Sequence, residues 1–339
     1  MNSVDAMERE IRYQVENLSQ LNLPKQTNLG DCMIVGSGDS YVAALIAQFA
    51  SNHKVICCNP MDIVLNPEIA KKNHRIYIVS VSGNTKANIL AAKVAKEQKV
   101  QTTAITANPE SKLAKSCDEI IQFQYKTTGI PTSGTISFTS SMLICLSLVS
   151  GVNYLGNLEM IYRETRKEVE NLIDEEEEKE EEEDYNMLED LSSYIFLGDG
   201  ILFPVAIYGA LKINEVIGSR SFAYPLEEFY HAPIFSIKRH DKIMILGNKE
   251  RECDILTNSR KPLYDKLKEL DFSSCYYTNC IRSSNSGNKL SLTDMLLKSI
   301  LFVQLYVVKQ AIGRGVKDCY FLQNKDILKL SSFFIYDMS

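Results

Sequence analysis

Apolar residues recur at intervals of three and four positions near the N-terminus. They are Val4, Met7, Ile11, Val15 and Leu18. This spacing places them on one face of an amphipathic helix. Pro24 and the turn-forming run Asn28-Leu29-Gly30 follow, and they favour an end to the helix. The pattern therefore predicts an N-terminal helix within residues 1–27.

Short apolar runs then alternate with helix-like stretches. The strand-like runs are 32–35, 54–57, 75–79, 100–106 and 119–123. The helix-like stretches are 40–50, 85–98 and 136–149. Strands that alternate with helices and lack strict polar alternation indicate a parallel sheet covered on both faces. The pattern predicts an α/β domain over residues 28–155.

The second half of the chain repeats this plan weakly. The run Ile34-Val35-Gly36-Ser37-Gly38-Asp39 resembles Phe196-Leu197-Gly198-Asp199-Gly200, 162 residues later, and a helix-like stretch follows each. Ile245 to Glu250 lies where a counterpart of the segment starting at Ser80 is expected, but it lacks hydroxyl residues. We therefore expect a duplication, with a helical and acidic linker at 156–188 and a second α/β domain with a C-terminal tail at 189–339.

The net charge of −6 comes from one tract rather than from the whole surface. Residues 174–184 contain ten acidic residues and one lysine, and the rest of the chain is nearly balanced. Such a block is usually a solvated helix or linker. No basic stripe with interleaved aromatic residues occurs, so nucleic-acid binding is not expected.

Neither a membrane segment nor a metal framework is expected. The N-terminus lacks a secretory pattern, and the apolar stretch 138–152 is short for a bilayer span and contains Ser and Thr, which favours a buried helix. The nine cysteines are an odd number without a C-x-x-C motif, and no histidine has a helical His partner. Reduced thiols in a cytoplasmic protein are the simplest interpretation.

The segment Ser80-Val81-Ser82-Gly83-Asn84-Thr85 connects a predicted strand to a predicted helix. Hydroxyl groups at a helix N-terminus suit a phosphate, and a glycine lets the backbone turn closely around it. The alternative is an ordinary turn in which Thr85 or Asn84 caps the helix. The segment is named the phosphate loop below.

A second turn, Gly36-Ser37-Gly38-Asp39-Ser40, follows the first predicted strand. Its third expected glycine position holds Tyr41, so it departs from the dinucleotide-binding fingerprint and disfavours nicotinamide chemistry. The backbone of Gly38 and the hydroxyl of Ser40 are candidates for binding a sugar. In the alternative interpretation they only close a tight turn.

Two residues in the second half have side chains suited to proton transfer. Glu215 lies in a largely apolar helical pattern, where a carboxylate must be paired or have a raised pKa, and a raised pKa would suit a general base. The alternative is a rim residue paired with Lys212. His231 precedes Ala232-Pro233, so we expect it in a loop rather than mid-helix, and histidine exchanges protons near neutral pH.

Three elements in register resemble the SIS (sugar isomerase) family. Ser80 to Thr85 resembles its S-x-S-G-[EN]-T phosphate loop, and Glu228-Phe229-Tyr230-His231-Ala232-Pro233 resembles its E-[LF]-x-H-G-P segment. The sixteen residues from Glu215 to His231 match the family's interval between base and ring-opening histidine. Over nearly its whole length the chain is similar to the isomerase half of glutamine–fructose-6-phosphate aminotransferase and to stand-alone phosphosugar isomerases and deaminases.

The resemblance implies a fold and a role for each motif residue. The fold would be two tandem SIS domains, each a mainly parallel five-stranded sheet flanked by helices in a flavodoxin-like three-layer sandwich. Glu215 would move a proton between C1 and C2, His231 would open the sugar ring from a partner subunit, and Lys329 would match the family's C-terminal lysine. The other implied contacts are phosphate binding by Ser80, Val81, Ser82 and Thr85, and sugar binding by Gly38 and Ser40.

The chain also departs from the family's pattern. Ala232 follows the histidine in place of glycine, Ser37 and Asp39 replace a cysteine and a threonine, and Gly134 stands where the aminotransferase has a serine. No glutaminase domain or N-terminal cysteine nucleophile is recognised, so glutamine hydrolysis is not expected.

The sequence thus predicts a phosphosugar aldose–ketose isomerase acting on a hexose 6-phosphate or its 2-amino analogue through an enediol or enolamine. One alternative is a glucosamine-6-phosphate-type deaminase, and another is a non-catalytic sugar-phosphate sensor. The presence of both Glu215 and His231 favours an enzyme. We expect a cytoplasmic homodimer that uses no cofactor and no metal.

Overall fold

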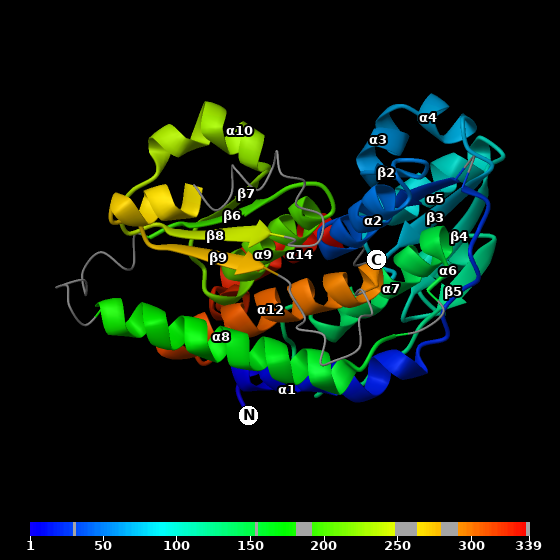
Figure 1. Ribbon diagram of the computed structural model, residues 1–339. Helices are drawn as coiled ribbons and strands as arrows, with labels where there is room; N and C mark the ends of the chain where they lie inside the picture. Colours follow the sequence, from blue (N-terminus) through cyan, green and yellow to red (C-terminus); the bar gives the residue numbers. More distant parts are fainter. Residues whose placement is uncertain (30–31, 153–154, 181–191, 248–262, 279–290, 337–339) are drawn as a thin grey trace. The chain divides into compact units, whose positions relative to one another are not determined.

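The computed structural model describes residues 1–29, 32–152, 155–180, 192–247, 263–278 and 291–336. They form an α/β fold that divides into two compact units, each with its own parallel sheet (Figure 1). Unit 1 comprises Met1–Ile11, Pro131–Ser133 and Gly156–Tyr320. Unit 2 comprises Arg12–Ile130, Gly134–Leu155 and Phe321–Ser339. The units therefore do not follow chain order, because each contains a terminal segment that is remote in sequence from its sheet.

The amphipathic pattern at the N-terminus forms helix α1 (Ser3–Asn17), followed by a 3-10 turn, η1 (Leu18–Gln20). Val4, Met7 and Ile11 are buried, as their spacing predicts.

Unit 2 contains a five-stranded sheet in the order β2-β1-β3-β4-β5, with every neighbouring pair parallel. The strands are β1 (Cys32–Val35), β2 (Ile56–Cys58), β3 (Arg75–Val79), β4 (Gln101–Thr106) and β5 (Glu119–Gln122). All five predicted strands are confirmed, with ends that differ by at most two residues. The strand order reverses direction between β1 and β3, which is the topological switch point of such a sheet.

Helices cover both faces of this sheet (Figure 1). They are α2 (Asp39–Ala50), α3 (Pro60–Leu65), α4 (Glu68–Lys71), α5 (Lys86–Glu97), α6 (Lys112–Ser116) and α7 (Ile136–Ser150). Met33, Ile76 and Ala104 share a buried core with side chains of α3 to α6. Helices α2 and α7 pack against each other on the opposite face. Unit 2 is therefore the predicted three-layer sandwich, and α3, α4 and α6 were not anticipated because they are short.

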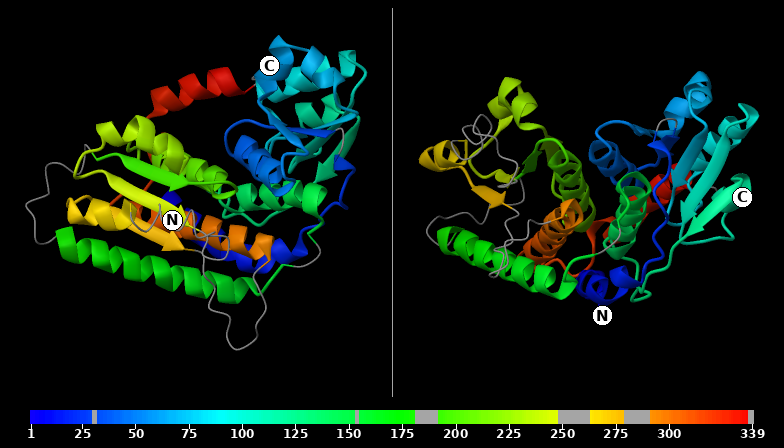
Figure 2. Two further views of the ribbon diagram at one scale, coloured as in Figure 1. Left: turned by 45° about the horizontal axis from the view of Figure 1, so that its top comes forward. Right: turned by 45° about the vertical axis from the view of Figure 1, so that its right-hand side comes forward.

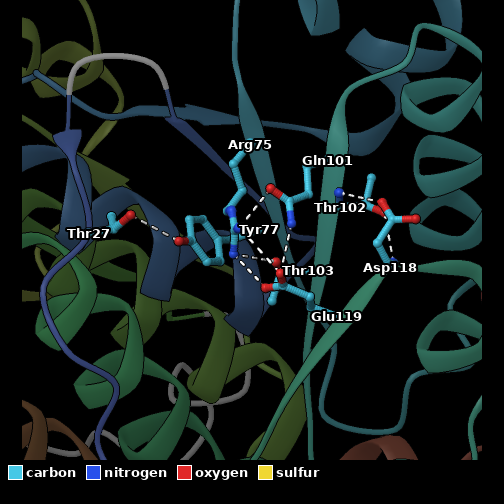
Figure 3. A network of polar contacts seen from close by, with 8 residues as sticks. All are labelled: Thr27, Arg75, Tyr77, Gln101, Thr102, Thr103, Asp118 and Glu119. Atoms are coloured by element: carbon cyan, nitrogen blue, oxygen red, sulfur yellow. Dashed lines mark hydrogen bonds and ion pairs between the residues drawn. The ribbon is translucent and has the colours of Figure 1, made fainter.

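A polar network fixes the register of β3, β4 and β5 where these strands begin (Figure 3). The guanidinium of Arg75 donates to Glu119 Oε2 at 2.5 Å and to Gln101 Oε1 at 2.7 Å. Gln101 Nε2 also donates to Glu119 Oε1 at 2.7 Å. These contacts lie at the amino ends of the strands, whereas ligands of parallel sheets bind at the carboxyl ends. We therefore assign this network to stability.

Unit 1 contains a second parallel sheet, in the order β7-β6-β8-β9. Its strands are β6 (Tyr194–Gly198), β7 (Ser221–Tyr224), β8 (Lys242–Gly247) and β9 (Ser274–Thr278). Within the described ranges this sheet has four strands, against the five expected. Residues 248–250, part of the predicted counterpart of the phosphate loop, lie outside the described residues.

The helices of unit 1 include α8 (Leu158–Glu180), α9 (Leu202–Val216), α10 (Leu226–His231), the 3-10 helix η4 (Pro233–Ser236) and α12 (Leu292–Gly313). Two further helices, α13 (Tyr320–Gln323) and α14 (Lys325–Ile335), end the described chain. Helix α8 includes residues 174–180, which are the start of the acidic tract. The rest of the tract lies outside the described residues.

Both sheets have the same glycine turn after the strand that comes first along the chain, β1 in one and β6 in the other. A Cβ on Gly36 would lie 2.6 Å from the Ser40 carbonyl oxygen, and a Cβ on Gly198 would lie 2.7 Å from that of Leu202. Two residues later, Gly38 and Gly200 have φ angles of +56° and +55°. The strand orders also correspond over four strands. The two sheets therefore share a strand order and a glycine turn.

Helix α12 is longer than the apolar stretch that the sequence pattern singled out. Among the described residues it alone has the length and composition to cross a membrane, but 89% of its apolar window is buried within the protein. It packs beside α8, where Lys298 Nζ donates to Glu168 Oε1 at 2.7 Å (Figure 2). Because Lys298 interrupts the apolar run in the sequence, the pattern did not single out this segment as a buried helix. Residues 138–149 lie in α7 and are buried, as expected.

The seven cysteines within the described residues form no disulfide. Burial raises the pKa of Cys58 to about 12 and that of Cys145 to about 12. Thiols with such pKa values remain protonated near neutral pH and react slowly. The cysteines therefore act as small apolar core residues.

Candidate active site

The phosphate loop connects β3 to α5 and is shaped by its own side chains. Gly83 donates its backbone N–H to the carbonyl oxygen and to Oγ of Ser80, both at 3.1 Å. Asn84 donates its backbone N–H to Ser82 Oγ at 3.3 Å. Gly83 has a φ of +66°, and its carbonyl oxygen accepts the N–H of Leu113 at 2.9 Å. A side chain at position 83 would collide with Ser111, so the turn requires glycine.

Thr85 occupies the N-cap position of α5, but its hydroxyl makes no capping hydrogen bond. Instead, Thr85 Oγ1 lies 3.4 Å from Ser80 Oγ. The first N–H groups of a helix have no partner within it, and the helix dipole favours an anion at that end. The loop therefore brings two hydroxyls to a helix N-terminus without using Thr85 as a cap. This geometry differs from the ordinary turn in which Thr85 caps the helix.

Gly38 and Ser40 lie in the turn after β1, the strand next to β3. Gly38 is the exposed N-cap of α2, and Ser40 is buried with its N–H donated to the Ser37 carbonyl oxygen at 3.2 Å. This turn follows β1, and the phosphate loop follows the adjacent strand β3. Both turns thus flank the switch point. Val81 contributes a carbonyl oxygen that accepts bonds from Ala107 N and Thr106 Oγ1, each at 3.1 Å, which anchors the loop to the end of β4.

Two departures from the family's pattern, Gly134 and Asp39, are neighbours in the structure. A Cβ on Gly134 would lie 2.6 Å from Asp39 Oδ2. The carboxylate of Asp39 thus occupies space that a serine at position 134 would need. A serine at position 134 would therefore require the Asp39 carboxylate to move.

The C-terminal segment is joined to the phosphate loop within unit 2. Tyr336 forms an isolated antiparallel bridge with Thr85. Lys86 Nζ donates to the Phe333 carbonyl oxygen at 2.6 Å and lies 5.1 Å from the centre of its ring. Lys329 lies on α14 of the same segment with an exposed side chain. The structure therefore places Lys329 in the same unit as the loop, although its residue number suggested the second domain.

In unit 1, Glu215 belongs to a compact group of three side chains near the C-terminal end of α9. Lys212 Nζ donates to Glu215 Oε2 at 2.6 Å and to Ser133 Oγ at 2.9 Å. Ser133 Oγ in turn donates to Glu215 Oε2 at 2.5 Å. Lys212 and Ser133 are buried, whereas 40% of the Glu215 side chain is exposed. A fully buried cation thus faces the carboxylate of a partly exposed side chain.

The electrostatics of Glu215 differ from the sequence-based expectation. Burial tends to raise its pKa, but the charge of Lys212 and the hydrogen bonds from Lys212 and Ser133 outweigh burial, so the pKa is lowered. The predicted raised pKa is therefore wrong, and the predicted alternative, pairing with Lys212, is present. The carboxylate is ionised at neutral pH, which is the form that accepts a proton.

His231 is the last residue of α10, so the predicted loop position is wrong, although the helix ends before Ala232 and Pro233. Its Nε2 lies 3.3 Å from Glu227 Oε1, one helical turn earlier, and 72% of its side chain is exposed. Within unit 1, the structure does not bring this ring to the Glu215 group. His231 is instead displayed at the surface beside a carboxylate.

Sequence reasoning missed two polar residues of the Glu215 group. The sequence analysis named Lys212 only as the partner of Glu215 in the alternative interpretation. It did not predict that the Lys212 side chain is completely buried. Ser133 was not considered, because 82 residues separate it from Glu215 and no local motif marks it. Only the fold brings these side chains together.

The class defined by these features is an α/β protein with a hydroxyl-containing loop beside the switch point of a parallel sheet and a lysine-paired carboxylate. Residues 30–150 match the SIS domain model. The chain is 28% identical to glutamine–fructose-6-phosphate aminotransferase (isomerizing) of Corynebacterium glutamicum over 240 residues, which are 66% of this chain and 38% of that relative. The matched region thus spans less than half of that protein.

Solved structures with similar folds cover nearly the whole chain. Glucosamine-6-phosphate deaminase of Thermotoga maritima matches with a TM-score of 0.65 and 20% identity, over 93% of this chain and 94% of that one. Tagatose-6-phosphate ketose/aldose isomerase of Escherichia coli matches with a TM-score of 0.62 and 15% identity, over 92% and 89%. At these identities the likeness concerns the fold alone.

The SIS domain match over residues 30–150, which include the phosphate loop, confirms the family resemblance for that part of the chain. Its relatives and structural neighbours include phosphosugar isomerases and deaminases.

Proposed function

We propose that this protein is a phosphosugar aldose–ketose isomerase that acts on a hexose 6-phosphate or a 2-amino-hexose 6-phosphate. The observation that carries the proposal is the Glu215 group, since a carboxylate held ionised by a buried lysine suits proton transfer. A sensor would need the phosphate loop but no such group. The names of the relatives, which include an isomerizing aminotransferase and a ketose/aldose isomerase, agree with this chemistry.

In the proposed mechanism the phosphate loop binds the substrate's phosphate through Ser80, Ser82 and Thr85, with Val81 holding the loop in place. Gly38 and Ser40 contact the sugar. His231 opens the ring, and Glu215 transfers a proton between C1 and C2. Lys329 is proposed as the C-terminal lysine of the site, because its helix is joined to the loop through Tyr336.

We further propose that unit 1 contains a second SIS domain related to the first by duplication. The matching strand order and the paired glycine turns at Gly36 and Gly198 support this proposal. Buried, protonated thiols fit a protein of a reducing compartment, so a cytoplasmic location is part of the proposal.

Proton NMR in D2O tests the reaction directly. Purified protein is incubated separately with fructose 6-phosphate, glucose 6-phosphate and glucosamine 6-phosphate. We expect deuterium to enter C1 or C2 of at least one of them, because the enediol or enolamine exchanges its proton with solvent. Release of ammonia together with exchange would identify a deaminase instead. Binding without exchange of any of the three would contradict the enzyme proposal and favour the sensor.

We propose that the protein acts as a homodimer in which His231 serves the partner's substrate. The His231 side chain is exposed, and its ring lies beside Glu227 of its own helix, which supports this arrangement. The inactive variants His231→Ala and Glu215→Gln are mixed in equal amounts and allowed to reassociate, so that half of the dimers contain one subunit of each. Each mixed dimer then has one intact site, made from Glu215 of one subunit and His231 of the other. We expect recovery of about a quarter of wild-type activity, given a twofold-symmetric dimer. No recovery, with mixed dimers confirmed by mass spectrometry, would place both residues in one subunit's site.

A further inference from the structure

The two carboxylate oxygens of Glu215 differ in their hydrogen bonds. The hydroxyl of Ser133 and the ammonium of Lys212 both donate to Oε2, at 2.5 and 2.6 Å. Hydrogen bonds to an ionised group are short and strong. An oxygen that accepts two of them is a weaker base than its neighbour. The Glu215 side chain is not fully enclosed, because 40% of it is exposed.

We infer that Ser133 is a positioning residue that, with Lys212, holds Oε2 of Glu215 and leaves Oε1 to transfer the substrate's proton. This inference rests on the proposed function, in which Glu215 is the base. It adds a residue that none of the recognised motifs contains.

Proton counting supports the assignment of donors. A serine hydroxyl has one proton, and Ser133 donates it to Glu215 because its oxygen already accepts from Lys212 at 2.9 Å. The Lys212 ammonium has three protons, and two of them point to Ser133 and Glu215. Its nitrogen also lies 5.3 Å from the centre of the Tyr208 ring. The lysine is therefore a fixed cation that cannot turn away from the carboxylate.

The surroundings hold each donor in place. Gln304 Nε2 of α12 donates to the Tyr208 hydroxyl at 3.0 Å, which fixes the ring beneath Lys212. The neighbouring Thr132 directs its hydroxyl elsewhere, because its Oγ1 donates to Glu10 Oε2 of α1 at 2.9 Å. A buried polar network in which each donor has an acceptor is rigid. Ser133 and Lys212 are therefore held against Glu215, and the Thr132 hydroxyl takes no part in this contact.

The chemical step follows from this arrangement. Oε1 takes the proton from C2 of the open-chain aldose, and the C–H electron pair forms the C1=C2 bond while O1 takes up the negative charge. The protonated carboxyl then returns the proton to C1, the O2–H proton passes to O1, and C2=O forms. Glu215 must keep one oxygen directed at two adjacent carbons in turn. Fixing Oε2 restricts the motion of Oε1 to that small range.

The charged and titratable neighbours of Glu215 determine the pH dependence. They are Lys212 on its own helix and Cys319, whose thiol pKa is raised chiefly by burial and also by the charge of Glu215. The hydrogen bond from Ser133 contributes to the lowered pKa of Glu215. Removing this donor therefore raises the pKa of the base toward its ordinary value. Since the base must be ionised, the acid limb of kcat/KM moves to higher pH.

The test compares Ser133→Ala with Thr132→Val, a matched control that removes the neighbouring hydroxyl and its bond to Glu10. For Ser133→Ala we expect kcat to fall about 10- to 100-fold, the scale of one hydrogen bond to a charged group, with KM little changed. The acid limb of its pH profile moves up, whereas that of Thr132→Val does not. Ser133→Thr keeps the hydroxyl, and we expect it to restore the wild-type acid limb.

A titration of ¹³C-labelled glutamate by NMR, without any sugar, gives the pKa of Glu215 independently of turnover. A higher Glu215 pKa in Ser133→Ala than in wild type and in Thr132→Val supports the inference. Equal pKa values and equal kcat in Ser133→Ala and wild type would overturn it. If the wild-type protein exchanges no proton with any of the sugar phosphates, the proposed function fails instead, and the titration still reports whether Ser133 acts on Glu215.

Discussion

Replacement of Glu215 by glutamine is expected to lower turnover at least about a hundredfold while ligand affinity changes little, the scale typical of losing a general base. Glutamine has nearly the same shape and can still accept the hydrogen bonds of Lys212 and Ser133 through its amide oxygen. It lacks a basic oxygen for the sugar's proton. The rate of deuterium entry at C1 and C2 measures the loss, and calorimetry with the sugar phosphate measures binding.

Glu159→Gln is the matched control for this variant. Glu159 lies on α8 of the same unit and pairs with the exposed side chain of Arg163 at 2.7 Å. Exposed pairs of this kind contribute little to stability, so we expect wild-type turnover. If Glu215→Gln were to turn over as fast as Glu159→Gln, Glu215 would be a structural partner of Lys212 and not the base.

Replacement of Gly83 by alanine is expected to destabilise the protein by about 2–5 kcal/mol, through a strained positive φ and overpacking. The added Cβ would collide with Ser111, whose Oγ caps α6 by accepting the N–H of Ala114 at 3.2 Å. Ser111 cannot move without loosening that helix. Because the same turn orients the hydroxyls of Ser80 and Ser82, the variant should also bind sugar phosphates more weakly. Denaturant unfolding and calorimetry measure the two effects.

The variant Gly129→Ala distinguishes the effect of backbone strain from that of overpacking. Gly129 also has a positive φ, of +76°, but a Cβ there would meet nothing within 4 Å. Only backbone strain should therefore act, at a cost of about 1–2 kcal/mol. Equal destabilisation by both substitutions would show that the contact with Ser111 is unimportant. Normal phosphate binding by a folded Gly83→Ala protein would remove the loop from the binding site.

The first sheet and its loop were predictable because the determining residues are contiguous. The β-branched run of β3, the hydroxyls of Ser80 and Thr85 and the helical spacing after them lie within about twenty residues of sequence. Alternating strand and helix patterns leave few arrangements other than a covered parallel sheet. Short helices such as α3 and α6 were missed, since one or two turns contain too few residues to display a period.

The Glu215 group shows where such prediction ends. Lys212 was visible at three residues from Glu215, but the sequence could not decide between an exposed ion pair and a buried cation beneath the carboxylate of a partly exposed side chain. That difference reverses the expected pKa shift of Glu215, because a desolvated charge at 2.6 Å outweighs the effect of burial on the carboxylate. Burial of a side chain depends on what packs over it, which is a property of the whole unit.

By itself the sequence determined the α/β class, the strands of the first sheet and the position of the phosphate loop after β3. It also identified Glu215 and His231 as candidate residues. Each of these results depends on neighbours along the chain. Only the tertiary structure decided that Ser133 contacts Glu215, that Lys212 is buried, that Thr85 is not used as a cap, and that the segment with Lys329 is joined to the phosphate loop. These contacts link residues from five to more than two hundred positions apart. Their geometry follows from packing, which no local pattern of residues specifies.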